Sequence, residues 1–345
     1  MKTPLRALLL TVLALAATFG LDPFRNYQLA TAAACFAAVA GLTVLVGLTG
    51  QLSLGHAVLM ASGGYGFALT ASAVDGPWPL ALLAGLAAAT IVSGLLGLLL
   101  GLAAARLRGP YLAGLTLALV IALPSAANSL PLGGDQGARA PFFAVPEPLA
   151  ALIALEQWHA WLAIAVAAIA VTPMVMLRSG RAGLRMRAVL DDETASRLSG
   201  VDPGLVKAGA FTASAVPAGL GGAVLAIATQ QVTPGGYGLA FSLLLVVAAV
   251  VGGLGSIGGA AIGSVLVVVL PWAVDELVAA LPADLGQRLN GNLAVLLFGV
   301  GLIALTLAWP GGAARLLDRL RAARPLRRTA PATGPSAEAA PGTGG

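Results

Sequence analysis

Apolar residues fill this chain in long runs that polar or charged residues interrupt only at intervals. Most runs hold about twenty residues, which is the length that an α-helix needs to cross the hydrocarbon core of a bilayer. The pattern therefore predicts an all-α polytopic membrane protein with about ten transmembrane helices. The apolar segments are 5–21, 28–48, 52–73, 78–104, 110–130, 158–177, 209–229, 239–254, 257–278 and 290–309.

The distribution of basic residues predicts the orientation of these spans. Ten spans place both termini on one side, and sixteen of the 19 Lys and Arg residues fall on that side. Only Arg25, Arg139 and Arg288 fall on the other. Because cytoplasmic connections are enriched in Lys and Arg, we expect a multi-pass protein of the cytoplasmic (inner) membrane with both termini in the cytoplasm. The first segment follows Lys2 and Arg6 as in a signal peptide, but further spans follow at once, so we expect it to be retained.

Composition supports the same class and limits the chemistry. Hydrophobic residues make up 58% of the chain and charged residues 10%, whereas soluble domains carry roughly 25% charged residues. The single cysteine, Cys35, allows no intrachain disulfide, and the two histidines lie far apart, so no metal site is expected. The basic charge fits membrane orientation beside lipid and not nucleic-acid binding. We expect a transmembrane permease domain over 1–312 and a basic, disordered cytoplasmic tail over 313–345.

One connection carries far more charge than any other. Residues 178–207 hold ten charged residues between two apolar runs, within the predicted cytoplasmic loop 178–208. A loop of this kind predicts a docking surface for a soluble partner. Residues 190–199 favour a short helix, because acidic residues near its start suit the helix dipole and Gly200 suits its end. The longest connection on the opposite side is the external loop 131–157.

The predicted spans carry no Asp, Glu, Lys or Arg at their centres. Proton-coupled carriers place ionisable residues there, and the recognisable catalytic and nucleotide-binding motifs are also missing. We therefore expect a transport component that is not an enzyme and whose driving energy comes from another subunit. A self-sufficient secondary carrier is the alternative, either with His56 in a proton relay or with sodium held by backbone carbonyls.

A polar, glycine-rich stretch, GLTGQLSLGHAVLMASGGYGFALTA, interrupts the apolar pattern from Gly47 to Ala71. Irregular backbone at membrane depth is tolerated where it is buried in protein or lines water, so the stretch predicts part of a translocation pathway. It resembles the membrane permeases of branched-chain amino acid ABC importers, of the M-subunit type, which carry G-x-T-G-Q-x-S-L-G-H-A before a glycine-rich segment. The predicted pathway residues are Thr49, Gly50, Gln51, Ser53, Gly55, His56, Gly64 and Tyr65.

The charged loop carries a second resemblance to the same family. Its sequence RMRAVLDDETASRLSGVDPGLVKAGAFTASA is similar to the family's R-A-I-R-E-N-E-x-A-A-E-A-x-G-I-N…K-x-x-A-F-x-x-S-A. In ABC permeases the resemblance implies a coupling helix that docks on the ATPase. Arg197 stands where the family usually has a glutamate, which leaves the identity of the ATPase open. The residues assigned to ATPase coupling are Arg187, Asp192, Glu193, Ala195, Arg197, Gly200 and Lys207.

The resemblance covers roughly residues 28–312 and implies a type II ABC importer-like fold. The implied function is a permease subunit for branched-chain or related hydrophobic amino acids. Its implied partners are a second homologous permease, two cytoplasmic ABC ATPases that bind the ATP, and an extracytoplasmic substrate-binding protein; no cofactor is expected in this chain. The external sequence LGGDQGA at 132–138 departs from the family's pattern, so a urea or short-chain amide importer remains an alternative.

A shorter pattern, G-x-x-S-[LI]-G-x-A, occurs twice, at Gly50–Ala57 and at Gly253–Ala260. Transporters often contain internal repeats, while a chain so rich in Gly and Ala also produces such matches by chance. Both explanations stay open at the level of sequence.

Overall fold

The computed structural model describes residues 2–107, 109–279, 299–300 and 303, most of which are helical. Six stretches are long and apolar enough to cross a membrane: Pro23–Thr49, Trp78–Arg106, Pro110–Ser129, Leu155–Ser179, Pro203–Thr229 and Pro234–Gly252. In chain order the α-helices are α1 (Lys2–Ala17), α2 (Pro23–Thr49), α3 (His56–Ala73), α4 (Trp78–Arg106), α5 (Pro110–Ser129), α6 (Glu147–Ala150), α7 (Leu155–Ser179), α8 (Arg181–Asp191), α9 (Glu193–Leu198), α10 (Pro203–Thr229), α11 (Leu239–Gly252) and α12 (Ile257–Ala279).

Nine of the ten predicted apolar segments lie among the described residues, and each corresponds to one helix. The tenth segment and the predicted tail lie outside the described residues. The structure thus confirms an all-α polytopic chain, while the number of membrane crossings and the type II class stay predictions. Several helix starts differ from those of the predicted apolar segments, most of all in α10, which begins at Pro203 and not at 209, because Asp202 caps it by accepting a hydrogen bond of 2.8 Å from Gly204 N. Lys207 therefore belongs to α10 and not to the loop.

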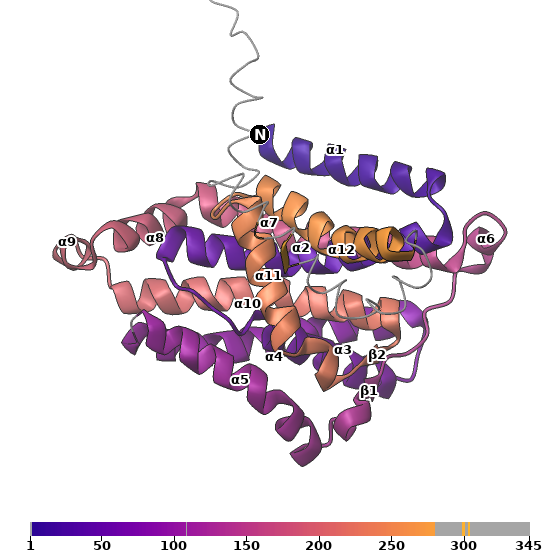
Figure 1. The fold of residues 1–345 in the computed structure, drawn as a ribbon, viewed down its shortest axis with the longest axis horizontal. Helices are drawn as coiled ribbons and strands as arrows, with labels where there is room; N and C mark the ends of the chain where they lie inside the picture. Colours follow the sequence, from indigo (N-terminus) through magenta and orange to yellow (C-terminus); the bar gives the residue numbers. More distant parts are fainter. Residues whose placement is uncertain (1, 108, 280–298, 301–302, 304–345) are drawn as a thin grey trace, which may run out of the picture.

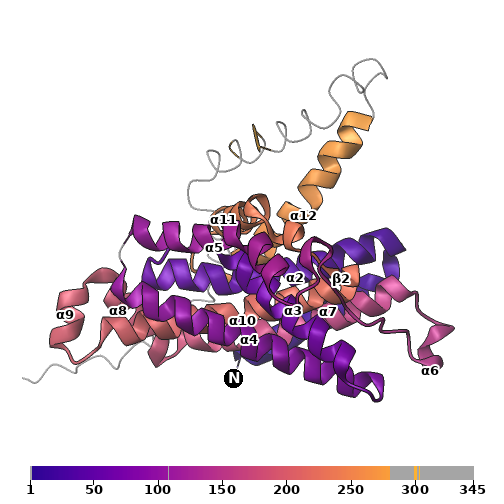
Figure 2. The same cartoon turned by 90° about the horizontal axis from the view of Figure 1, so that it is seen from below.

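The long helices form a bundle with two distinct ends (Figure 1). Helix α10 lies at its centre and packs against α2, α3, α4 and α7. Helices α8 and α9 lie at one end, while α6 and the strands β1 (Ala138–Arg139) and β2 (Gln231–Val232) lie at the other. Figure 2 shows the far half of α12 tilting away from the other helices. The predicted charged loop and the predicted external loop thus lie at opposite ends of the bundle.

Small residues let the central helices approach closely. A Cβ atom at Gly63 would overlap the Gly219 backbone, and one at Gly101 would lie 2.6 Å from the Ala208 carbonyl oxygen. Gly97, four residues before Gly101, likewise faces α10, where an added Cβ would overlap that of Ala215. Such packing replaces the hydrophobic drive that helices lack in lipid.

The connection between α5 and α7 folds over one end of the bundle. It contains the 3₁₀ helix η2 (Gly134–Gln136), strand β1 and helix α6. Strand β1 pairs antiparallel with β2, with Ala138 opposite Val232. A second 3₁₀ helix, η3 (Pro234–Tyr237), follows β2 and contacts η2. At this end the connection after α5 therefore contacts the connection between α10 and α11.

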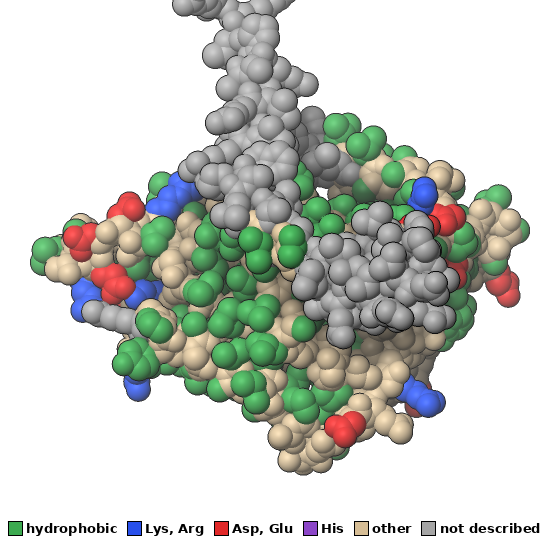
Figure 3. Space-filling model, viewed as in Figure 1, with side chains coloured by type: hydrophobic (Ala, Val, Ile, Leu, Met, Phe, Trp, Pro, Cys, Tyr) green, Lys and Arg blue, Asp and Glu red, His purple; other side chains and the backbone are tan. Residues whose placement is uncertain are grey.

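Hydrophobic side chains cover the middle of the molecular surface (Figure 3). Lys, Arg, Asp and Glu side chains gather toward the two ends of the same view. Large apolar residues on α4 and α5 are exposed, among them Leu83, Ile91, Leu99 and Ile121. In a bilayer these side chains would face lipid, which explains an apolar surface of this extent.

Candidate translocation and coupling site

The predicted pathway begins where α2 stops. Gly50 has φ +67°, the left-handed conformation that ends helices at glycine. The chain then runs without helical structure until α3 begins at His56. We call residues 50–55 the re-entrant segment. The expected third apolar segment, 52–73, is therefore an irregular stretch followed by a shorter helix.

Two neighbouring helices hold the re-entrant segment inside the bundle. Leu54 N donates to Thr116 Oγ1 of α5 at 3.0 Å, and the Ser242 hydroxyl of α11 donates to the Leu54 carbonyl. Ser53 Oγ accepts from Gly55 N at 3.3 Å and lies 3.0 Å from His56 Nδ1. These bonds satisfy backbone groups that lipid could not. Irregular backbone here is buried in protein, as the sequence predicted.

Some polar atoms of the segment have no partner. Both amide atoms of Gln51 and Nε2 of His56 are buried and form no hydrogen bond within the described part of the chain. Gln51 is only 6% exposed. An unpaired buried polar group costs about 1–3 kcal/mol. The Gln51 amide is therefore placed to gain a partner when something else enters the site.

The remaining predicted pathway residues lie farther along α3. A Cβ atom at Gly64 would lie 3.2 Å from the Gly222 carbonyl oxygen and 3.4 Å from the Tyr237 hydroxyl. The hydroxyls of Tyr65 and Tyr237 are both buried without a partner among the described residues. The prediction did not include Tyr237, because its place in η3 beside α3 follows only from the tertiary fold.

The charged loop forms two helices and not one. Asp192 has an extended backbone (φ −155°) between α8 and α9 and caps α9, since its Oδ1 accepts from Thr194 N at 2.7 Å and from Ala195 N at 3.1 Å. At the other end Gly200 has φ +78°, and Val201 N donates to Ser196 O at 3.0 Å. This is the Schellman arrangement that glycine favours. The predicted helix over 190–199 is thus α9, Glu193–Leu198, with its glycine stop confirmed.

The sequence prediction missed α8. Its buried residues, Gly183, Met186 and Val189, recur every three positions and face the bundle. Arg181, Arg185 and Arg187 are exposed, and Arg187 Nη2 donates to the Arg178 carbonyl at 3.3 Å. This helical spacing of apolar and basic residues was the signal that could have identified the helix. We call α8 and α9 together the charged arm.

An ion pair fastens the charged arm to the bundle. Lys207 Nζ of α10 bonds to Glu193 Oε1 of α9, and the two side chains are 10% and 32% exposed respectively. Ala195, Arg197 and Gly200 instead face outward. Beside them Leu198 is 87% exposed, although it is apolar and stands among charged residues.

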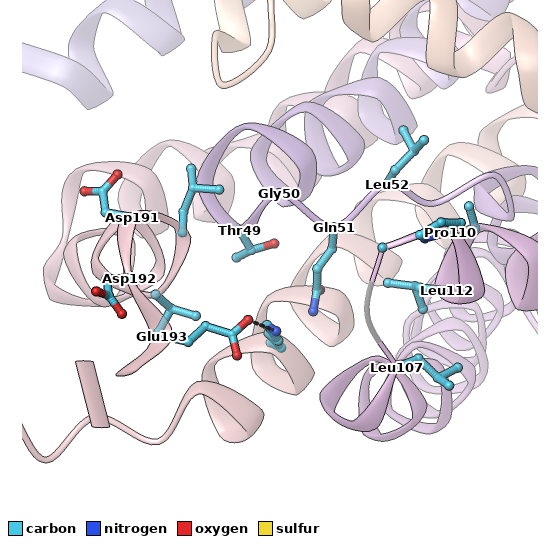
Figure 4. A pocket seen from close by; sticks show the side chains of 15 residues that line it. Thr49, Gly50, Gln51, Leu52, Leu107, Pro110, Leu112, Asp191, Asp192 and Glu193 are labelled. Atoms are coloured by element: carbon cyan, nitrogen blue, oxygen red, sulfur yellow. Dashed lines mark hydrogen bonds and ion pairs between the residues drawn. The ribbon is translucent and has the colours of Figure 1, made fainter. Parts of the chain in front are cut away.

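The charged arm meets the re-entrant segment directly. A Cβ atom at Gly50 would lie 2.8 Å from Leu190 Cδ1 of α8. Beside this contact lies a pocket of about 640 Å³ (Figure 4), into which the Gln51 side chain extends. The pocket brings together six of the residues predicted for the two roles: Thr49, Gly50, Gln51, Asp192, Glu193 and Lys207.

The other predicted site residues do not line this pocket. Ser53, Gly55, His56, Gly64 and Tyr65 lie within the bundle, where their roles include packing and hydrogen bonding. The described residues contain no group of three or more His, Cys, Asp or Glu that could hold a metal ion. This geometry can couple motion of the charged arm to the re-entrant segment, in which the buried amide of Gln51 has no hydrogen-bond partner among the described residues.

Comparison with known proteins identifies the family of this chain. The chain belongs to the family described as branched-chain amino acid transport system / permease component, whose model matches residues 26–306. It is 31% identical over 256 residues to the high-affinity branched-chain amino acid transport system permease protein LivM of Salmonella typhimurium, and 30% identical over 262 residues to LivM of Escherichia coli. Each match covers 66% of this chain and 58% of the relative, so the chain spans less than two thirds of those proteins. No solved structure matches it.

Proposed function

We propose that this chain is a transmembrane permease subunit of an ABC importer and that it carries branched-chain or related hydrophobic amino acids. Family membership supports a permease, and the names of the relatives support this substrate class. The observation that carries the proposal is the contact of the charged arm with the re-entrant segment through Leu190 and Gly50. An energy source outside the chain needs such a link to reach the pathway.

In this proposal the charged arm faces the cytoplasm, both termini lie on that side, and the membrane is the cytoplasmic membrane. The transporter has two ABC ATPases, which bind the ATP, and one of them docks on the outward face of α9, with Ala195, Arg197 and Leu198 in the contact. The exposed apolar side chain of Leu198 supports docking, because burial in a partner would remove it from water. A second homologous permease and an extracytoplasmic substrate-binding protein complete the transporter, and this chain itself carries no cofactor.

Coupling then follows from packing. When the ATPases move α9, the Glu193–Lys207 pair transmits the displacement to α10, and Leu190 transmits it to Gly50. Packed elements shift between discrete arrangements and do not deform continuously. The re-entrant segment would thereby alternate between the arrangement described here, in which the Gln51 amide and His56 Nε2 have no partner among the described residues, and one in which Gln51 and His56 bond a passing zwitterion.

Reconstitution tests the proposal. The chain is placed in proteoliposomes together with the ATPases, the second permease and the binding protein that neighbouring genes encode. Uptake of labelled leucine is then measured in the presence of ATP. We expect ATP-dependent leucine uptake from the complete set. The chain alone, under a proton or sodium gradient, should accumulate nothing; accumulation there would favour the secondary carrier. Uptake of urea or acetamide without leucine uptake would favour the alternative substrate class.

A further inference from the structure

Helix α8 has one face that packs on the bundle and one that is exposed. The packed face lies against α2, α7 and α10. The opposite side is exposed and carries Arg181, Leu184, Arg185 and Ala188. These residues recur at intervals of three and four and therefore share one face of the helix. We call it the α8 outer face; it combines positive charge with an apolar side chain, Leu184, that is 62% exposed.

The start of α8 is fixed against the end of α7. A Cβ atom at Gly183 would overlap the Arg178 carbonyl oxygen and lie 2.6 Å from that of Leu177, so glycine is what allows this tight turn. Met176, in the last turn of α7, is apolar and 66% exposed, as a side chain that faces acyl chains would be. Helix α8 therefore begins at the depth where α7 leaves the apolar layer and lipid headgroups lie.

The charge of this part of the chain is all of one sign. From Arg178 to Leu190 the sequence RSGRAGLRMRAVL contains four arginines and no Asp or Glu. In the described part of the chain, Arg178, Arg181 and Arg185 form no ion pair. A guanidinium group matches the geometry of phosphate oxygens. Three unpaired guanidinium groups beside an exposed leucine thus favour a ligand that carries both a phosphate and acyl chains.

We propose that the α8 outer face binds anionic phospholipids of the cytoplasmic leaflet and that this contact holds α8 at the membrane surface while an ATPase moves α9. The three unpaired arginines contact headgroup phosphates, and Leu184 enters the upper part of the acyl layer, as in amphipathic helices that lie in the interface. Asp192, with its extended backbone, joins α8 directly to α9, so a fixed α8 gives α9 a pivot. The inference rests on the proposed function, because it takes this end of the bundle to be cytoplasmic.

The test places a fluorescent probe on the α8 outer face of the assembled transporter. In a Cys35→Ala background, Leu184→Cys is labelled with a fluorophore, and the complete complex with its ATPases is reconstituted in phosphatidylcholine vesicles. Increasing fractions of phosphatidylglycerol or of phosphatidylcholine, each with the same nitroxide quencher near the top of an acyl chain, are then included. We expect half-maximal quenching at a roughly tenfold lower fraction of the phosphatidylglycerol, since each arginine near the surface adds to the attraction.

Two pairs of substitutions locate the effect. Arg181→Gln together with Arg185→Gln should remove most of the preference for phosphatidylglycerol, whereas Arg181→Lys together with Arg185→Lys should keep it, because the attraction follows charge. Arg139→Gln is a matched control at an exposed residue of β1, at the opposite end, and should change nothing. A wild type without preference, or a preference that survives in the glutamine pair, would overturn the proposal.

Other occupants of this face give different results. Soluble glycerol phosphate, which has the phosphate without acyl chains, should not displace the quenching lipid at equal concentration; displacement would assign the arginines to a soluble anion. Quenching of the permeases alone that disappears when the ATPases are added would show that an ATPase covers this face. Either result would contradict lipid binding in the working transporter.

Uptake separates this inference from the proposed function. With ATP, binding protein and labelled leucine, we expect several-fold faster initial uptake by the wild type when phosphatidylglycerol is present than in phosphatidylcholine alone, and little difference for the glutamine pair. Equal wild-type rates in the two lipids would refute the anchoring role even where quenching shows that lipid binds. An absence of leucine uptake in every lipid would refute the proposed function, and the quenching preference would then decide whether α8 binds anionic lipid.

Discussion

The ion pair between Glu193 and Lys207 offers the sharpest test of how the charged arm works. Glu193→Lys places a second ammonium group beside a lysine that is only 10% exposed, and Lys207→Glu places two carboxylates together. In each variant the start of α9 is repelled from α10. The double variant, which carries both reversals, again places opposite charges on α9 and α10.

The size of the effect follows from burial. Removing one partner of a fully buried pair costs about 3–5 kcal/mol, whereas exposed pairs contribute about 0–1 kcal/mol. Lys207 is buried, but Glu193 is 32% exposed, so we expect about 2 kcal/mol, between these limits. Since about 1.4 kcal/mol is a factor of ten, α9 should become roughly 30-fold less firmly docked on α10.

The assay measures leucine uptake and ATP hydrolysis on the same proteoliposomes. For both single variants we expect normal assembly but several-fold more ATP hydrolysed per leucine taken up, because the arm no longer moves α10. The double exchange should return the ratio most of the way to the wild-type value. As a matched control, Glu147→Lys makes the same change at an exposed residue of α6, at the opposite end, and should leave the ratio unaltered. Single variants with a wild-type ratio, or a double exchange no better than they are, would refute the coupling role.

Two further predictions concern orientation and the cap of α9. In a Cys35→Ala background, a cysteine at Leu198 should resist impermeant thiol reagents in intact cells and one at Gln136 should react; the reverse labelling would invert the proposed topology. Leu198 suits this experiment better than Ser196, which is 5% exposed and would be shielded in either orientation. Asp192→Ala removes the two capping bonds and should destabilise α9 by about 1 kcal/mol, raising ATP hydrolysis per leucine less than the charge reversals do; Asp192→Asn, which can still cap, should behave as wild type.

Apolar length was sufficient to predict nine of the helices, though not α6 or α8, and turn chemistry predicted where α9 ends. Gly200 ends α9 as the sequence predicted, and Gly50, which the sequence assigned only to the pathway, ends α2 with a positive φ as well, because this is a local conformation that glycine adopts readily. The bonds that hold the re-entrant segment were beyond prediction. Thr116 and Ser242 lie 62 and 188 positions from Leu54, and each looks in sequence like an ordinary small polar residue inside an apolar span.

The structure shows where the two copies of the G-x-x-S-[LI]-G-x-A pattern lie. Each copy begins in the break between two helices, the first between α2 and α3 and the second between α11 and α12. Gly50 and Gly253 both have a positive φ, +67° and +101°. The second break packs on α2 close to the first, since Gly255 N donates to Thr43 Oγ1 at 2.9 Å. The two glycines share a positive φ but differ in ψ, which is 9° at Gly50 and 117° at Gly253, so the local geometry does not decide between a repeat and chance.

A substitution at Gly55 can distinguish a packing role of the re-entrant segment from a role in transport. Its φ is −106°, so a side chain there meets no backbone restriction. A Cβ atom would, however, lie 2.9 Å from the Thr116 carbonyl oxygen and 3.0 Å from Thr116 Cβ. Overpacking of this kind costs about 1–3 kcal/mol, because α5 and the segment must move apart.

We therefore expect Gly55→Leu to lower both the melting temperature and leucine uptake. Gly114→Leu is a matched control on α5, where an added Cβ meets nothing within 4 Å, and Leu52→Ile is a mild change at a residue that is 42% exposed; both should retain stability and uptake. A Gly55→Leu protein with unchanged stability and no uptake would assign the glycine to the pathway. A stable and active variant would show that the contact with Thr116 constrains neither folding nor transport.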